Sequence, residues 1–171
     1  MNPDVFPTLF TELLKLRQLE VSDANQIFLL RSDSTINEYL DRQPSKTLED
    51  AEGFVKNIIE SPGLFYWAIT KQDNEKLIGT VCLFEILEGQ KKCEIGYELL
   101  SEYQGKGIML EAVKKVMDYA VNRLGMTAIE AFSHKENQNS TKLLKKLAFQ
   151  KEAINEENSN VVLFRFNSPN R

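Results

Sequence analysis

A glycine-containing turn between a strand-like and a helix-like segment constrains the fold of this chain more than any other feature. Residues 94–100 are mostly apolar and predict a strand, whereas apolar residues recur at helical spacing over residues 109–120. Gly105 and Gly107 lie in the turn between them, and residues 128–133 again predict a strand. A helix that connects two strands returns the chain to the same end of the sheet, so these strands should run parallel. The sequence therefore predicts a mixed α/β sheet.

The same turn predicts a ligand. The first N–H groups of a helix have no acceptor within the helix, and the helix dipole is positive there, so a glycine turn at this point binds phosphate. Glycine lets the backbone approach an anion closely, and Lys106 adds a cation. A P-loop would need Ser or Thr after its Gly-Lys pair, and the dinucleotide fingerprint would need glycine in place of Leu110. The residues alone therefore predict a phosphate-bearing ligand without naming it.

Three blocks of the sequence carry a family resemblance. In the pattern Arg/Gln-x-x-Gly-x-Gly/Ala, the specified places are held by Gln104, Gly107 and Met109, and Met109 departs from the small residue expected. Residues 137–149 are similar to the pattern Asn-x-x-Ser-x-x-Leu-x-x-Lys-x-Gly-Phe, and residues 9–17 to an opening Thr-Glu-Arg-Leu-x-Leu-Arg. In this order, the blocks resemble the GNAT superfamily of acetyl-CoA-dependent N-acetyltransferases. The opening block is similar to the Rim-type subgroup, which acetylates the N-termini of ribosomal proteins.

The resemblance implies a fold and a domain organisation. It covers about residues 9–166, so we predict a single domain over residues 1–171 with a core of about 9–167. The implied GNAT fold is a mixed α/β structure with a mostly antiparallel twisted sheet of six to seven strands, flanked by about four helices. In that fold a parallel pair of strands splays apart, and the pantetheine arm of CoA lies in the gap. The strands are expected at residues 13–19, 64–70, 77–85, 91–99, 128–133, 149–154 and 161–167, and the helices at 22–30, 47–60, 105–124 and 140–147. Residues 47–50 have the form of a capping box, and the aromatic residues 65–67 are expected first to pack in the core, with a place in the acceptor pocket as the alternative.

Composition and charge limit the classes of partner. The net charge of −4 and the pI near 5.2 argue against a nucleic-acid-binding protein, although an acidic surface suits cationic substrates. No apolar run approaches the ~20 residues that cross a bilayer, and the N-terminal residues lack the features of a signal peptide. We therefore expect a cytosolic protein without a membrane partner. Cys82 and Cys93 are expected to be free thiols, and no Cys-x-x-Cys or His pair predicts a metal site.

The resemblance also implies which residues bind acetyl-CoA. The pyrophosphate loop corresponds to residues 104–109, and the main chain of Leu99 and Leu100 would hold the thioester. Asn137 matches the family residue that hydrogen-bonds the pantetheine arm. From the residues alone, Asn137 and Asn139 could instead be turn and N-cap residues, and Ser140 is also a good N-cap for the following helix. The full set expected to bind the cofactor is Leu99, Leu100, Gln104, Gly105, Lys106, Gly107, Ile108, Met109, Asn137 and Ser140.

Acetyl transfer by direct attack of an amine needs a base for the amine and a donor for the departing thiolate. Many GNAT enzymes carry a tyrosine at the place of Leu144, which cannot donate, so Ser140 becomes the candidate acid. For the base we select Glu94; Glu98 shares its strand face by alternation, and a solvated polar face would explain both carboxylates equally well. His134, the only histidine, is a further candidate because imidazole titrates near neutral pH.

The predicted function is transfer of an acetyl group from acetyl-CoA to an amine, with no metal. A protein N-terminal α-amine, such as that of a ribosomal protein, is favoured because its pKa near 8 leaves a neutral fraction at pH 7. A polyamine or aminoglycoside is an alternative acceptor. Two further alternatives are a regulatory module that binds acyl-CoA without turnover and a nucleotide-binding domain. A monomer or a homodimer is compatible with this function.

Overall fold

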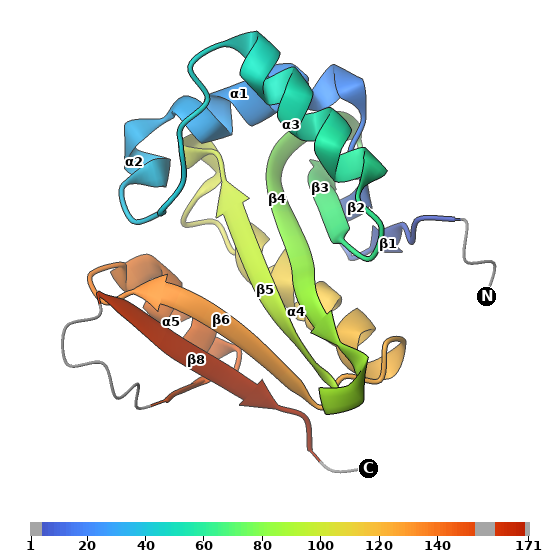
Figure 1. Cartoon of the computed structure of the whole chain (residues 1–171), viewed down its shortest axis with the longest axis vertical. Coiled ribbons are helices and arrows are strands. Elements are labelled where there is room, and N and C mark those ends of the chain that lie inside the picture. The colour runs from blue at the N-terminus through green and yellow to red at the C-terminus, as the bar shows by residue number, and fades with distance from the viewer. Residues whose placement is uncertain (1–4, 153–159, 170–171) are drawn as a thin grey trace.

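The computed structural model describes residues 5–152 and 160–169. The described residues form one sheet in the order β1-β2-β3-β4-β5-β6-β8-β7, with helices on both faces (Figure 1). The strands are β1 (Leu9–Phe10), β2 (Leu14–Gln18), β3 (Phe65–Lys71), β4 (Asn74–Leu87), β5 (Lys92–Leu99), β6 (Ala128–His134), β7 (Gln150–Lys151) and β8 (Val161–Asn167). The α-helices are α1 (Ala24–Ser32), α2 (Ser34–Asn37), α3 (Leu48–Glu60), α4 (Ile108–Asn122) and α5 (Gln138–Lys146).

The predicted mixed sheet is confirmed. All neighbouring strands pair antiparallel except β5 and β6, which are parallel and joined by α4. The sheet has one strand more than expected, because the short β1 pairs Leu9 with Leu16 at the edge. The expected final hairpin is present as β7 and β8, whereas its connection over residues 153–159 lies outside the described residues.

The parallel pair splays apart after a short contact. β5 and β6 pair only over Lys92–Glu94 and Ala128–Glu130, although β5 continues to Leu99 and β6 to His134. Figure 1 shows the two strands diverging from this vertex. The backbone groups on the facing edges of the diverging parts are therefore not used in pairing between β5 and β6. This gap is the predicted place for the pantetheine arm.

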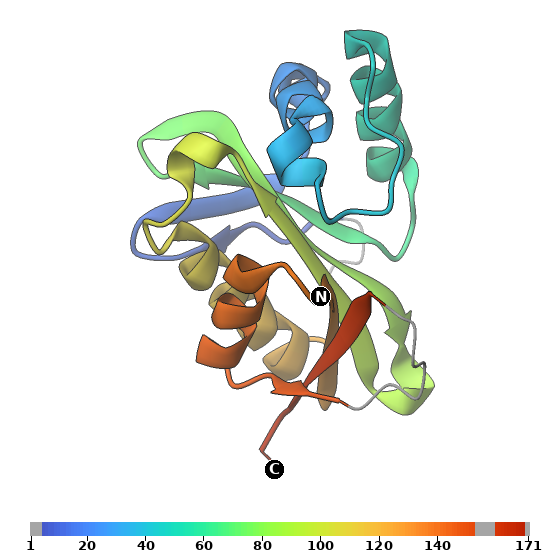
Figure 2. The ribbon, with the colours of Figure 1, turned by 90° about the vertical axis from the view of Figure 1, so that its left-hand side faces the viewer.

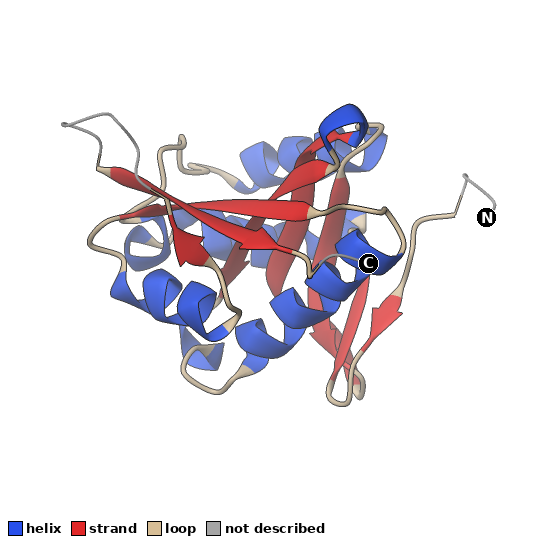
Figure 3. Cartoon of the chain, turned by 90° about the horizontal axis from the view of Figure 1, so that it is seen from below, coloured by secondary structure: helices blue, strands red, loops and turns tan. Residues whose placement is uncertain are grey.

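Two apolar clusters fix the layers. α1 and α3 cover one face of the sheet and α4 and α5 the other, as Figures 2 and 3 show. In α4 the apolar residues that recur at helical spacing are those that the structure buries, and a fully buried Val or Met side chain contributes about 1.5–3 kcal/mol to folding. The buried residues of α4 are Ala112, Val113, Val116, Met117 and Ala120. The long helix thereby holds the glycine turn at a fixed place beside the gap.

Several local expectations are also confirmed. The expected capping box at the start of α3 is formed: Thr47 Oγ1 accepts from the Asp50 N–H at 3.1 Å, and the Asp50 carboxylate accepts from the Thr47 N–H at 3.0 Å. Ala148 follows α5 with φ of 63°, the conformation for which the family pattern has glycine. Cys82 and Cys93 are free, and burial raises the pKa of their thiols to about 12 and about 11.

Two absences apply to the described residues. Within residues 5–152 and 160–169, no helix combines the length and the apolar content that a membrane span requires. Over the same ranges, no three His, Cys, Asp or Glu side chains lie together as they would around a metal ion.

Candidate active site

The glycine turn before α4 presents free backbone donors. Gly105 and Gly107 have φ of 73° and 78°, in the left-handed region that favours glycine. Gly107 is the N-cap of α4 and receives the first helical hydrogen bond, from the Glu111 N–H at 3.1 Å. The N–H groups of residues 108–110 precede Glu111, the first donor of the helix, so they have no acceptor within the helix, and Gly107 has no side chain to cap them. The turn and the helix dipole together form a site for an anion.

Three side chains of this loop make contacts within the protein. Gln104 Nε2 donates to the Leu99 carbonyl at 2.9 Å, which fixes the loop to the end of β5. Lys106 is exposed, and its Nζ donates to the Glu102 carbonyl at 2.8 Å. Met109 packs its side chain against the main core. The departure from a small residue at Met109 therefore leaves the backbone of the loop accessible.

The end of β5 points one backbone donor into the gap. The Leu100 N–H donates to the Ile78 carbonyl at 3.0 Å, so these two residues form a hydrogen-bonded pair of β4 and β5. Because such pairs alternate along an antiparallel ladder, Leu99, opposite Gly79, directs its N–H and C=O away from β4 and towards the gap. The Leu99 carbonyl accepts the hydrogen bond from the Gln104 side chain, whereas the Leu99 N–H remains available as a donor. The Leu99 and Leu100 side chains are buried, as expected for residues that act through their main chain.

The residues predicted on the far side of the gap lie at the start of α5. Asn137 is the N-cap, and its Oδ1 accepts from the Ser140 N–H at 3.2 Å. The alternative of Ser140 as the cap is therefore wrong. Its hydroxyl instead lies 2.7 Å from the hydroxyl of Tyr97, which comes from β5. Leu144, one turn later on α5, is fully buried in the core.

The opposite face of β5 carries the two candidate bases, which share that face as the alternation predicts. The Glu98 side chain is only 6% exposed, and its Oε2 lies 2.6 Å from Arg42 Nη2. Thr80 Oγ1 donates to the other carboxylate oxygen at 3.4 Å. The guanidinium of Arg31 lies 4.0 Å from the centroid of the Phe54 ring. Burial, followed by the positive charge of Arg42, lowers the pKa of Arg31. Glu98 is thus a buried carboxylate paired with the Arg42 guanidinium.

Glu94 has a different environment. It lies at the vertex of the splay, opposite Glu130, and is half-buried. Burial, followed by the charges of Glu130 and Glu85, raises the pKa of Glu94. Glu94 is five residues before Leu99 along the strand, which corresponds to roughly 16 Å at about 3.3 Å per residue. The structure therefore brings Glu98, but not Glu94, next to the Leu99 N–H.

The connection between α2 and α3 closes this face of the gap, and the sequence did not predict that. The Tyr39 ring stacks on His134, the last residue of β6, with 5.1 Å between ring centroids. Arg42, three residues further, contacts Glu98 of β5 and donates from Nε to Asn37 Oδ1 at 2.7 Å. We call residues 38–42 the strap, because they touch both diverging strands. His134 Nδ1 accepts a hydrogen bond from the Glu136 N–H at 3.2 Å, so this ring nitrogen already has a hydrogen-bond donor.

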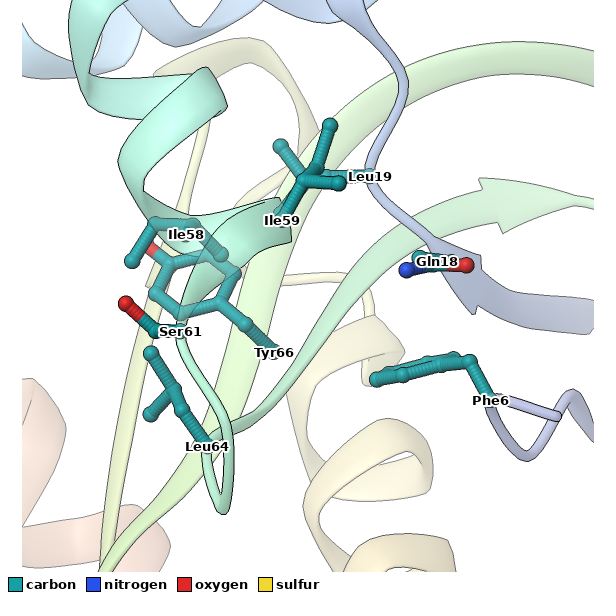
Figure 4. Close-up of a pocket in the computed structure, with 8 residues that line it drawn as sticks. All are labelled: Phe6, Gln18, Leu19, Ile58, Ile59, Ser61, Leu64 and Tyr66. Carbon is teal, nitrogen blue, oxygen red and sulfur yellow. The ribbon is translucent and has the colours of Figure 1, made fainter. Parts of the chain in front are cut away.

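Figure 4 shows a small recess elsewhere in the molecule. Its volume of about 70 Å³ is enough for about two waters. It shares none of the residues that bind at the gap. The recess is lined by Phe6, Gln18, Leu19, Ile58, Ile59, Ser61, Leu64 and Tyr66.

The predicted core role of the aromatic segment of β3 is confirmed. Trp67 is fully buried, and its Nε1 donates to the Pro7 carbonyl at 2.7 Å.

Comparisons with known proteins agree with this geometry. The family model described as an acetyltransferase (GNAT) domain matches residues 14–150. An uncharacterized N-acetyltransferase, YoaA of Bacillus subtilis, is 32% identical over 88% of this chain and 86% of its own length. Spermidine N(1)-acetyltransferase of Escherichia coli is 29% identical over 81% of this chain and 74% of its own length. The [ribosomal protein uS5]-alanine N-acetyltransferase of the same species is 28% identical over 58% of this chain and 52% of its own length.

The fold is also similar to solved structures. The crystal structure of spermidine N-acetyltransferase from Vibrio cholerae in complex with CoA and spermine superposes with a TM-score of 0.80. The identity is 23%, and the match covers 92% of this chain and 96% of that one. The predicted arrangement of the sheet, the parallel pair and the flanking helices is therefore the arrangement found in that protein.

Proposed function

Because the chain belongs to the GNAT family of acetyltransferases, we propose that it transfers the acetyl group of acetyl-CoA to a primary amine by direct attack. The observation that carries this proposal is the presence of free backbone donors both at the start of α4 and at the end of β5, two places that Gln104 links through the Leu99 carbonyl. The N–H groups at the start of α4 suit a pyrophosphate, and the Leu99 N–H faces the gap between β5 and β6. A pantetheine arm lying in the gap would connect these two sites.

The chain's own residues would divide the work as follows. Residues 104–109 bind the pyrophosphate, and the side-chain amide of Asn137 hydrogen-bonds the pantetheine arm. The Leu99 N–H donates to the thioester oxygen as negative charge develops on it. The amine nitrogen forms a bond to the carbonyl carbon, the C–S bond breaks, and its electron pair leaves on the sulfur. The amine loses a proton to a base, and no group of the protein is acetylated.

Of the two candidate bases, the geometry favours Glu98. A base must approach the attacking amine to hydrogen-bond distance, directly or through one water. Glu98 directly precedes Leu99, the proposed donor to the thioester oxygen, whereas Glu94 is roughly 16 Å along the strand at about 3.3 Å per residue. In the structure Glu98 is paired with Arg42 of the strap. When the amine binds, the strap must therefore move, or Arg42 and the amine must both contact the carboxylate.

For the acceptor, we propose a protein N-terminal α-amine, such as that of a ribosomal protein. The support is electrostatic: Glu98 is already paired with Arg42, and the positive charges of Arg42 and Arg31 interact with each other, which disfavours a polycation there. The [ribosomal protein uS5]-alanine N-acetyltransferase among the relatives is consistent with this acceptor.

A polyamine is the second candidate, and a different observation favours it. Glu85 is exposed and Glu94 is half-buried, and their negative charges interact, so together they offer a second anionic point for a long cation. The spermidine acetyltransferases among the relatives match over a larger share of this chain than the ribosomal-protein enzyme.

Release of free thiol from acetyl-CoA tests both candidates in one assay. The acceptors are peptides that begin with the N-terminal residues of ribosomal proteins, and spermidine. CoA binding is followed by thermal shift in the same samples, with ATP and NAD as ligand controls. Turnover with the peptides and protection by CoA alone is the expected result. Turnover with spermidine alone would replace the acceptor, and stabilisation by ATP or NAD but not by CoA would contradict the proposed cofactor.

A further inference from the structure

A pair of hydroxyl groups bridges the gap on the face that carries α5. Tyr97 lies on β5 beyond Glu94, the last residue of that strand to pair with β6, and Ser140 lies in the first turn of α5, which follows β6. The two hydroxyl oxygens are 2.7 Å apart, a good hydrogen-bond distance. The pair is thus a contact between the two sides of the gap in which the thioester is proposed to lie.

The chemistry of the two groups decides the direction of this hydrogen bond. A phenol is a stronger acid than an alkyl alcohol, so the phenol is the better donor and the alcohol oxygen the better acceptor. Burial raises the pKa of Tyr97 to about 12, so the phenol keeps its proton over the neutral pH range. Tyr97 therefore donates to Ser140 Oγ. The hydroxyl proton of Ser140 is then free to point to another acceptor.

The position at which many GNAT enzymes carry a tyrosine offers no such donor here. Leu144 holds that position, and its side chain is fully buried in the core cluster. Ser140 and Leu144 are four residues apart on α5 and thus lie on the same side of the helix. The phenol that bonds to this side of α5 comes from β5, which is the neighbouring strand across the gap.

We propose that Tyr97 is a positioning residue for acetyl transfer, which orients the hydroxyl of Ser140 towards the sulfur of CoA. The inference rests on the proposed function. When the C–S bond breaks, the electron pair stays on the sulfur as a thiolate, and the Ser140 hydroxyl donates a hydrogen bond to it. Neither hydroxyl gives up its proton, because a thiolate is a much weaker base than an alkoxide or a phenolate, and the thiolate later takes its proton from water.

The experiment measures the ionisation of the CoA thiol in the complex of CoA with the full chain, without any acceptor. The ultraviolet absorbance of the thiolate is followed against pH, and a titration of the protein alone is subtracted. Burial raises the pKa of the Cys82 and Cys93 thiols to about 12 and about 11, and the titration of the protein alone removes their contribution. The proteins are the wild type, Tyr97→Phe, Ser140→Ala and the double variant. Tyr119→Phe is the control, because Tyr119 packs on Phe65 and Trp67 in the core rather than at the gap.

The expected result is that Tyr97→Phe and Ser140→Ala each raise the pKa of the bound thiol by about one pH unit, a tenfold change in the ionisation constant. The double variant should equal the single ones, because both changes remove the same hydrogen bond. Tyr119→Phe should match the wild type. In turnover, Tyr97→Phe should lower kcat and leave the KM for acetyl-CoA unchanged.

Two results would overturn the inference. One is an unchanged thiol titration in Tyr97→Phe, whether or not Ser140→Ala shifts it. The other is additive shifts in the double variant, which would show that the two hydroxyls act separately. Failure of the wild type to bind CoA would be a different failure, because it would contradict the proposed function itself. Thermal unfolding of each variant confirms that the compared proteins are folded.

Discussion

At the scale of single residues, Glu98 shows how neighbours decide the use of a carboxylate. Because successive side chains of a strand point to opposite faces, Glu94 and Glu98 lie on the same face of β5, as the sequence predicts. Only the structure shows that one of them is half-buried at the vertex and the other is enclosed beside Arg42. The partner of Glu98 comes from a connection without periodicity, 56 positions earlier in the chain. No spacing rule relates those two positions.

Glu98→Gln tests the assignment of the base. The amide keeps the size of the side chain but cannot take a proton, so we expect kcat/KM to fall about 100-fold, the lower end for a general base, because an α-amine is partly neutral already. Glu94→Gln is the matched control on the same strand and face, and its loss should be at least tenfold smaller. The measurement is thiol release at saturating acetyl-CoA, with CoA affinity determined separately. Equal losses in the two variants would contradict the assignment.

At the scale of elements, the close approach of β4 to the end of β5 fixes the catalytic backbone. A Cβ added at Gly79 would lie 2.5 Å from the Glu98 carbonyl oxygen and 3.1 Å from the Leu99 Cα, so the strands could not keep their present separation. The glycine therefore allows the Leu99 N–H to sit where the register places it. A strand glycine in the sequence does not by itself distinguish this role from a bulge or a bend.

Gly79→Ala should therefore displace Leu99 and lower kcat by at least about tenfold, which corresponds to ~1.4 kcal/mol of lost transition-state stabilisation. CoA should still bind through the α4 turn, which is a separate element. Gly53→Ala in α3 is the control, since a Cβ there meets nothing within 4 Å. That change should stabilise the fold by about 0.5–1 kcal/mol and leave kcat unchanged. Normal turnover by Gly79→Ala would show that the position of Leu99 is not critical.

A second element, the short parallel contact at the vertex, depends on one carboxylate. Glu130 on β6 accepts from Lys92 on β5 at 3.2 Å, and from Arg165 on β8 through Nε at 3.1 Å. Burial would raise the pKa of Glu130, but the hydrogen bonds from Arg165 and Lys92 outweigh it and lower the pKa below its usual value. Glu130 thus joins the three strands on which the splay is built.

The sign of that pKa shift predicts the acid sensitivity of the fold. A group whose pKa is lowered by folding stabilises the protein above its unfolded pKa of about 4.3, and this contribution is lost as the pH falls through the lower, folded value. We expect urea unfolding of the wild type to become easier below about pH 4 in part for this reason. Glu130→Gln should be less stable at neutral pH and show a shallower fall on acidification. Parallel pH profiles of the two proteins would contradict this.

At the scale of the whole molecule, periodicity and turn residues predicted most of the elements and the parallel crossover. They did so because each of those signals is local: α4 carries its buried stripe, α3 its capping box, and the turn its glycines. The splay itself came only from the family resemblance. The strap, the pairing of Arg42 with Glu98 and the contact of Tyr97 with Ser140 were missed, because each joins distant positions through the fold. The short edge strand β1 was too brief to show alternation.

The central claim of this account is that CoA binds with its pyrophosphate on the turn before α4, and calorimetric titration with CoA tests it most directly. Gly107 and Gly125 flank α4 with φ of 78° and 71°, and a Cβ at either position meets nothing within 4 Å. Alanine at either position should cost about 1 kcal/mol of stability from backbone strain alone. We predict that Gly107→Ala weakens CoA binding at least about tenfold, or ~1.4 kcal/mol, while Gly125→Ala binds like the wild type. Equal affinity of the two variants would contradict the claim.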